Sequence, residues 1–252
     1  MNQPISYQEM TEKVKKINQR DYDYEQPFFD LVDQLLDESE GKHVHNFLTD
    51  AFERLLAQVN KEIELVEDEL GLTPTCGVGC AHCCYFPIIV TRLEAKLMLL
   101  FINQLPEARK QRIFLQISEY HDKFSSEINV IKKFDFKKDD SFKLKYKQLG
   151  LPCMFLDEET NRCIAYEVRP IPCRTYLNYT NASVCSEEHL PKEPVSFEFL
   201  HRFYVQGMDE IIQEILEVVS DQSLGFSYPN DAAEVNYLPI LIEEELNKKS
   251  LK

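Results

Sequence analysis

Apolar residues recur at helical spacing through most of the chain. A first apolar stripe over residues 28–36 follows the i, i+3, i+4, i+7 spacing of one buried helix face, and Pro27 suits its first turn. A second stripe runs from Val44 to Leu70 and is followed by Gly71, a residue typical of the position just beyond a helix end. These patterns predict that residues 1–71 consist of N-terminal helices.

Helical patterns continue after a loop rich in cysteine and glycine. Thr91 and Glu94 have the Thr-x-x-Glu spacing of a capping box, which predicts a helix from there to about Gln104. Pro106 begins the pattern of another helix. In the C-terminal part, apolar residues repeat at helical spacing from 199 up to 225, and a last helix is expected over 239–248.

Two segments have a different pattern. Residues 142–147 alternate apolar and basic side chains, which predicts a half-buried strand with its lysines facing outward. Residues 154–156 and 163–166 flank a polar turn and predict a β-hairpin. The expected fold is therefore mainly α, a helical bundle-like domain with a small β-hairpin region. The expected division is 1–71 N-terminal helices, 72–190 a cysteine-cluster metal-binding domain and 191–252 C-terminal helices.

Charge and hydropathy exclude some classes of function and location. The 252 residues include 43 acidic and 28 basic side chains and have a net charge of −15, which argues against a nucleic-acid or anionic-membrane binder. No basic-then-apolar leader is present, and the longest apolar run, 97–102, is too short to span a bilayer. We therefore expect a cytoplasmic protein whose cysteines stay reduced.

One segment reverses this charge locally. Residues 132–147 contain seven lysines and three aspartates, a net charge of +4. The lysines either protect the edge of the predicted strand or dock an acidic partner or anionic substrate. The pattern alone leaves both interpretations open.

The eight cysteines carry the chemistry. Four of them lie within nine residues, at 76, 80, 83 and 84, and this spacing allows a loop to bring several sulfurs onto one metal ion or cluster. Gly77 and Gly79 suit such a loop because they allow positive φ. Consecutive side chains in extended backbone point to opposite sides, so we do not expect Cys83 and Cys84 to be equivalent ligands of one site.

The other four cysteines, at 153, 163, 173 and 185, are more widely spaced. Two of them flank the predicted hairpin, and Cys173 follows Arg169-Pro170-Ile171-Pro172, in which two prolines stiffen the chain. Arg169 and Arg174 place positive charge beside a thiolate, which would stabilise a negatively charged tetrathiolate site. Alternatively, both arginines pair with surface carboxylates.

These motifs resemble a known family. Cys-x₃-Cys-x₂-Cys-Cys at 76–84, followed by Cys153-Met-Phe-Leu and Cys163-Ile-Ala-Tyr-Glu-Val-Arg-Pro-Ile-Pro-Cys173-Arg174, is similar to the YkgJ-type cysteine-cluster family, CxxCxxCC. The resemblance covers about 72–190. It implies a zinc- or iron-chelating domain, often described as Fe–S-cluster-containing, and a distant relationship to flagellin lysine N-methylases. It makes candidate ligands of Cys76, Cys80, Cys83, Cys84, Cys153, Cys163, Cys173 and Cys185, with Tyr166, Arg169, Pro170 and Arg174 supporting the site.

Ligand chemistry favours zinc or an iron–sulfur cluster, because hard cations prefer oxygen. Our preferred prediction is an iron–sulfur cluster in a redox or accessory role, with a protein or redox partner. Alternatives are a zinc-stapled interaction module or a metal chaperone, in which His82 could supply a nitrogen ligand or lie next to the site. A third alternative is an enzyme that transfers a group from S-adenosylmethionine. Cys76-x₃-Cys80-x₂-Cys83 has the spacing of the radical-SAM triad, but the alternating βα pattern of such enzymes is missing from the sequence. No catalytic residue is predicted, and enzymatic activity stays open.

Overall fold

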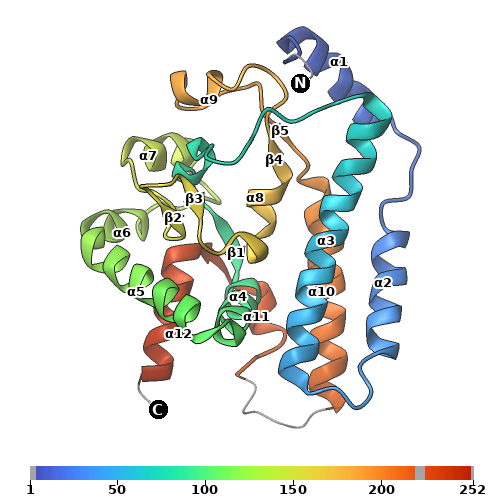
Figure 1. The fold of residues 1–252 in the computed structure, drawn as a ribbon, viewed down its shortest axis with the longest axis vertical. Coiled ribbons are helices and arrows are strands. Elements are labelled where there is room, and N and C mark those ends of the chain that lie inside the picture. Colours follow the sequence, from blue (N-terminus) through green and yellow to red (C-terminus); the bar gives the residue numbers. More distant parts are fainter. Residues whose placement is uncertain (1–3, 219–224, 251–252) are drawn as a thin grey trace.

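The computed structural model of the chain describes residues 4–218 and 225–250 and is mainly helical, which confirms the predicted fold class (Figure 1). The described residues contain twelve α-helices, two short 3₁₀ helices and three two-stranded antiparallel sheets. The segment 219–224, for which the sequence predicts continued helix, lies outside the described residues.

Three helices form a bundle along one side of the molecule. They are α2 (Gln26–Asp37), α3 (Val44–Leu70) and α10 (Phe199–Val218), preceded by the short α1 (Tyr7–Asn18) (Figure 1). The predicted apolar stripe of α3 is buried, and Gly71 ends the helix with φ 60°, as its position predicts. At Gly207, α10 comes so close to its neighbours that a Cβ would lie 3.1 Å from Val32 and 3.3 Å from Leu55.

A second layer packs against this bundle. It contains α4 (Arg92–Gln104), α5 (Glu107–Lys123), α6 (Ser125–Ile131), α11 (Asn230–Ala233) and α12 (Leu238–Ser250). The strands β1 (Ile89–Thr91) and β6 (Val235–Tyr237) pair just before α4 and α12, so the C-terminal helix is attached to the middle of the chain.

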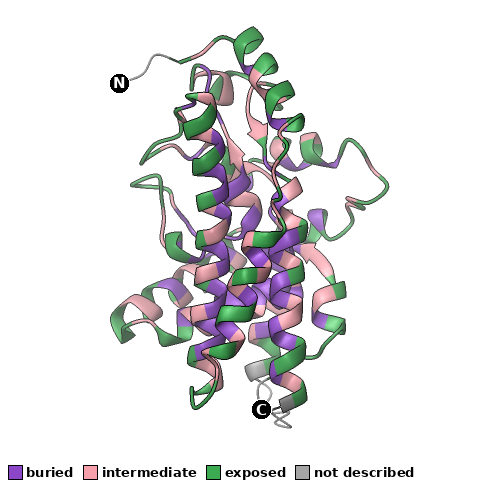
Figure 2. Cartoon of the chain, turned by 90° about the vertical axis from the view of Figure 1, so that its right-hand side faces the viewer, coloured by how far each residue is buried: buried purple, intermediate pink, exposed green. Residues whose placement is uncertain are grey.

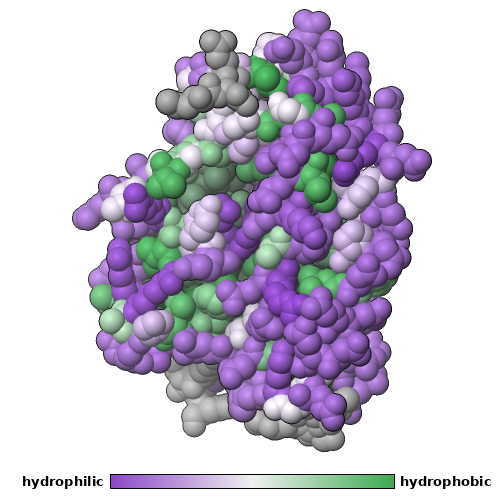
Figure 3. Space-filling model, turned by 45° about the vertical axis from the view of Figure 1, so that its right-hand side comes forward, coloured by the Kyte–Doolittle hydropathy of each residue, from purple (hydrophilic) through white to green (hydrophobic). Residues whose placement is uncertain are grey.

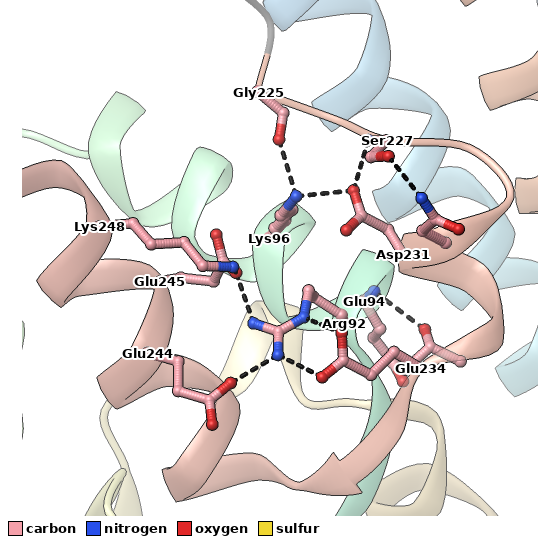
Figure 4. A network of polar contacts seen from close by, with 12 residues as sticks. Arg92, Glu94, Lys96, Gly225, Ser227, Asp231, Glu234, Glu244, Glu245 and Lys248 are labelled. Carbon is pink, nitrogen blue, oxygen red and sulfur yellow. Dashed lines mark hydrogen bonds and ion pairs between the residues drawn. The ribbon is translucent and has the colours of Figure 1, made fainter.

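An ion-pair network fixes this attachment. The Arg92 side chain is only 6% exposed and bonds to three carboxylates, those of Glu234, Glu244 and Glu245, while Lys96 pairs with Asp231 (Figure 4). A guanidinium group presents several N–H donors in fixed directions, which suits one buried centre that joins α4, α12 and the residue just before β6.

Short elements form the remaining part of the molecule, and they hold the cysteines. These are the 3₁₀ helices η1 (His82–Tyr85) and η2 (Tyr166–Val168); α7 (Phe142–Gln148), α8 (Ile171–Thr175) and α9 (Val184–Glu187); and the strands β2 (Leu156–Asp157), β3 (Arg162–Cys163), β4 (Tyr176–Leu177) and β5 (Val195–Ser196). The predicted hairpin is present as β2 and β3, with Leu156 opposite Cys163.

The structure corrects two local predictions. Residues 142–147 form helix α7 and not a strand, because Phe142 and Tyr146, one helical turn apart, are both buried while Leu144 between them is only partly covered. At the start of α4, Thr91 accepts the N–H of Glu94 at 3.1 Å as predicted. The Glu94 carboxylate, however, does not complete the capping box, because it accepts a hydrogen bond from the Ile171 amide.

Buried residues line the inner faces of the helices, and their apolar side chains join in one core that extends from Met10 to Ile242 (Figure 2). On the face drawn in Figure 3, hydrophilic residues predominate and apolar residues form patches between them. Among the helices of the described ranges, none has the length and apolar character needed to cross a membrane.

Candidate metal centre

All eight cysteines are free thiols carried by the short elements around η1. Cys76 and Cys80 lie in the loop after α3, which turns at Gly79 with φ 89°, whereas Gly77 does not have positive φ. Cys83 and Cys84 lie in η1, and Cys153 lies in the loop before β2. Cys163 lies in β3, Cys173 in α8 and Cys185 in α9.

Backbone hydrogen bonds join the two halves of the cysteine motif. The Cys153 amide donates to the Cys84 carbonyl at 2.6 Å, and the Thr75 amide donates to the Asn178 carbonyl at 2.7 Å. Helix α9, which carries Cys185, packs against η1. Segments that are distant in the sequence are therefore held together by main-chain contacts, whose geometry does not depend on the surrounding side chains.

The thiols form two groups, and the members of each group are not consecutive in the sequence. Burial raises the pKa of Cys173, and the neighbouring Cys153, Cys83 and Cys163 raise it further. Burial also raises the pKa of Cys185, to about 11, and here Cys76 and Cys80 are the neighbours. We call Cys84, Cys153, Cys163 and Cys173 the inner thiol group, and Cys76, Cys80, Cys83 and Cys185 the outer thiol group.

Cys83 and Cys84 connect the two groups. Their backbone is 3₁₀ helix and not extended, which corrects the premise from which opposite orientations were expected. A hydrogen bond from the Cys84 thiol lowers the pKa of Cys83 to about 7, and the positive charges of Arg169 and Lys147 act in the same direction. The same hydrogen bond raises the pKa of Cys84. Of these two adjacent thiols, Cys83 is therefore the more acidic.

Backbone amides donate to several sulfurs. The Asn178 amide lies 3.3 Å from Cys76 Sγ, and the Phe155 amide lies 3.5 Å from Cys153 Sγ. A hydrogen bond from the Ala165 amide lowers the pKa of Cys163, although burial, the larger effect, raises it. N–H···S bonds of this kind stabilise thiolate ligands and tune the potential of iron–sulfur clusters.

Three cationic side chains surround the thiols. Lys147 donates to the His82 carbonyl at 3.0 Å, and its ammonium lies 4.4 Å from the centre of the Phe86 ring. Arg169 stacks on the Tyr166 ring at 3.9 Å. Arg174 is buried and donates to the Arg169 carbonyl at 2.8 Å and to the Glu167 carbonyl. Among the described residues neither arginine forms an ion pair with a carboxylate, so the alternative interpretation of these two side chains is wrong.

The chemistry of this donor set fits a thiophilic metal. Eight thiols, amide donors to sulfur and nearby cations are the features that stabilise thiolates around zinc or iron. Within residues 4–218 and 225–250, however, no group of three or more histidine, cysteine, aspartate or glutamate side chains is arranged so that it could hold a metal ion as it stands. Ligation would therefore require the sulfurs to converge further.

Comparison with known families agrees with this chemistry. The model of the family CxxCxxCC, described as "Putative zinc- or iron-chelating domain", matches residues 75–190. Residues 75–190 are a CxxCxxCC domain. No solved structure matches this chain. The match to the CxxCxxCC domain confirms the resemblance seen in the sequence and covers all eight cysteines.

Sequence reasoning missed three residues that contact the elements of this domain. Lys147 appeared only as part of an alternating strand, Asn178 belongs to no motif, and Glu94 appeared only as a helix cap. The only signal for Lys147 in the sequence is its position. It is the last lysine of the basic segment, and this segment immediately precedes the second half of the cysteine motif. In the described parts of the chain the sheets are two-stranded and antiparallel, so the βα architecture of a radical-SAM barrel is not found there.

Proposed function

We propose that the CxxCxxCC domain holds a cysteine-ligated iron–sulfur centre with a redox or accessory role. The observation that carries this proposal is that eight free thiols, from residues 76–84 and 153–185, lie on neighbouring short segments joined by main-chain hydrogen bonds. Four thiolates are the usual ligand set of an iron–sulfur cluster, which supplies one-electron transfer when bound. Free thiols also agree with the reducing, cytoplasmic environment that we propose for this protein.

The surroundings of the sulfurs favour iron–sulfur chemistry. Amide donors reach Cys76 and Cys153, and Lys147, Arg169 and Arg174 add positive charge that would offset the negative charge of a tetrathiolate cluster. Cys76 and Cys83 are exposed, so the outer thiol group reaches the surface where electrons could be exchanged with a partner.

A structural zinc role is the second candidate. The elements that carry Cys84, Cys163 and Cys173 of the inner thiol group are very short: η1 has four residues, β3 has two and α8 has five. Such short elements have little stability of their own, and closed Cys₄ zinc sites stabilise folds of this kind. In that case the helices would provide the binding surface and the metal would only hold the cysteine-bearing segments together.

The basic segment indicates the charge of a partner. Lys133, Lys137 and Lys143 are exposed and form no ion pair within the described residues, and Lys147 of the same segment contacts η1. In a protein with a net charge of −15, this local excess of positive charge would orient an acidic partner protein toward the cysteines.

Metal analysis decides between the two candidates. Protein purified without oxygen should be brown, absorb near 400 nm and contain iron and acid-labile sulfide in equal amounts. Colourless protein with stoichiometric zinc would overturn the iron–sulfur proposal and support the zinc role. Protein with neither metal, after purification with both supplied during expression, would overturn both.

A further inference from the structure

Glu94 has a buried carboxylate that is not among the proposed metal ligands. It lies in the first turn of α4 and is 4% exposed, although ionisable side chains are rarely so buried without a partner (Figure 4). Burial raises its pKa to about 7, and no lysine or arginine within the described residues forms an ion pair with it. Helix capping does not explain this position, because its carboxylate accepts the Ile171 amide and not the backbone N–H of the N-cap residue Thr91.

The Glu94 carboxylate is bonded to the start of α8. Its Oε1 accepts the amide hydrogen of Ile171 at 3.0 Å. Pro170 and Pro172 on either side have no N–H, so Ile171 provides the only amide donor of this three-residue segment. Two residues later, the Cys173 amide closes the first turn onto the Pro170 carbonyl at 2.9 Å.

Helix α8 also packs against α3, α10 and β1, and polar side chains contribute to its contacts with α10 and with its own loop. Thr175 Oγ1 lies 2.8 Å from His201 Nε2, and the Tyr204 hydroxyl lies beside the Glu94 carboxyl. Arg174 holds the preceding loop through the carbonyls of Glu167 and Arg169. Glu94 is thus the contact through which α4, which follows the first cysteine segment, fixes the turn that bears Cys173.

We propose that Glu94 is a positioning residue for Cys173: its carboxylate holds the Ile171 amide and thereby orients α8 toward the inner thiol group. This role for Glu94 rests on the proposed metal-binding function. The hydrogen bond between Glu94 and Ile171 can nevertheless be tested with or without metal. The essential property is a hydrogen-bond acceptor at this reach. A glutamine keeps that acceptor, an aspartate withdraws it by one methylene group, and an alanine removes it.

The test is site-resolved alkylation of the full-length protein as purified, with iodoacetamide and mass spectrometry. Cys185 of the outer thiol group, which has no contact with Glu94, is the internal reference. The ratio of Cys173 to Cys185 labelling should rise about tenfold in Glu94→Ala and in Glu94→Asp, which is the factor expected when one buried hydrogen bond is lost. It should stay at the wild-type value in Glu94→Gln.

Glu62→Ala is the matched control. Glu62 is also buried, on α3, and accepts a 2.6 Å hydrogen bond from Gln58 of the same helix. If Glu62→Ala raises the Cys173 ratio as much as Glu94→Ala does, or if Glu94→Ala leaves it unchanged, Glu94 has no specific role. Metal content is measured on the same samples. Wild-type protein without metal would overturn the proposed function, while the labelling ratio would still decide the role of Glu94.

Discussion

The amide of Cys153 donates a 2.6 Å hydrogen bond to the carbonyl oxygen of Cys84. This single contact places the first cysteine of the wide-spaced half directly beside the last cysteine of the tight-spaced half. Cys84 is thus a neighbour of Cys153 and Cys173, whereas Cys185 is a neighbour of Cys76, Cys80 and Cys83. The two halves of the motif thus each contribute to both thiol groups.

Separate thiol groups predict separate losses of metal. Cys84→Ser removes a member of the inner thiol group and Cys80→Ser removes a member of the outer thiol group. Each variant should lose about half of the bound metal, and the double variant should lose nearly all of it, because a site with one ligand missing binds metal far more weakly. Metal content per chain measures this.

Ser186→Ala, next to Cys185 and exposed, is the control and should keep the full content. If either single variant loses all of its metal, the two groups do not act as independent sites. If the double variant retains as much metal as either single variant, the assignment of these two cysteines as ligands is wrong.

The buried thiols predict that the metal-free protein is less stable at high pH. Burial raises the pKa of Cys153 to about 12, compared with about 9 for an ordinary thiol. In the unfolded chain this thiol ionises near pH 9, whereas in the folded chain it stays neutral. Its contribution to stability is therefore complete below pH 9 and is lost as the pH rises from 9 to 12, by about 1 kcal/mol per pH unit.

Urea unfolding in chelator and reductant, at pH 8, 9 and 10, measures this dependence. Cys153→Ala removes the ionising group, so its free energy of unfolding should fall less steeply over the same range than that of the wild type. Tyrosines that also titrate at high pH contribute equally to both proteins. Parallel curves for wild type and variant would show that Cys153 is not responsible.

The Arg92 network predicts a large loss of stability on truncation. Arg92→Ala would leave Glu245, whose side chain is 9% exposed, without its guanidinium partner, and should lower the free energy of unfolding by about 3 kcal/mol. Hydrogen bonds from Arg92 lower the pKa of Glu234, so the stabilisation is present at neutral pH and is lost as the pH falls below about 4.

Arg112→Ala provides the comparison, because Arg112 pairs with Asp157 at 3.0 Å while its side chain is 66% exposed. Solvent screens such a pair, and its loss should cost less than about 1 kcal/mol. Chemical unfolding of both variants at pH 7 gives the two values. Similar losses for Arg92→Ala and Arg112→Ala would contradict a special role for the buried network.

Close helix packing at Gly207 predicts that larger side chains are not tolerated there. A Cβ at this position would lie 3.1 Å from Val32 Cγ2 and 3.3 Å from Leu55 Cδ2, so Gly207→Val should cost about 2 kcal/mol through overpacking. Gln206→Val, on the exposed side of the same helix, introduces the same side chain without the close contact, and it loses helix propensity where Gly207→Val gains it. Thermal unfolding should separate the two variants, and equal midpoints would mean that the helices move apart freely.

Local patterns in the sequence determined the helices and the presence of a metal-binding motif. The stripe from Val44 to Leu70 and the glycine after it are signals contained within one element, and the structure follows them closely. The cysteine spacing at 76–84 likewise needs no tertiary information to indicate chelation. The alternation of apolar and basic residues over 142–147 led to the wrong prediction of a strand, because such a short pattern fits either a strand or a two-turn helix. Only the burial of Phe142 and Tyr146 selects the helix.

Tertiary structure alone decided which cysteines are neighbours and which side chains surround them. The pairing of Cys153 with Cys84, the position of Lys147 over Phe86 and the reach of Glu94 to Ile171 each join residues that are more than 60 positions apart. The physical reason is that such contacts depend on how helices and loops pack, which no local spacing encodes. The sequence determined that this protein carries a cysteine motif of the chelating type, and the packing of α4, α7 and α8 decided how those cysteines are grouped.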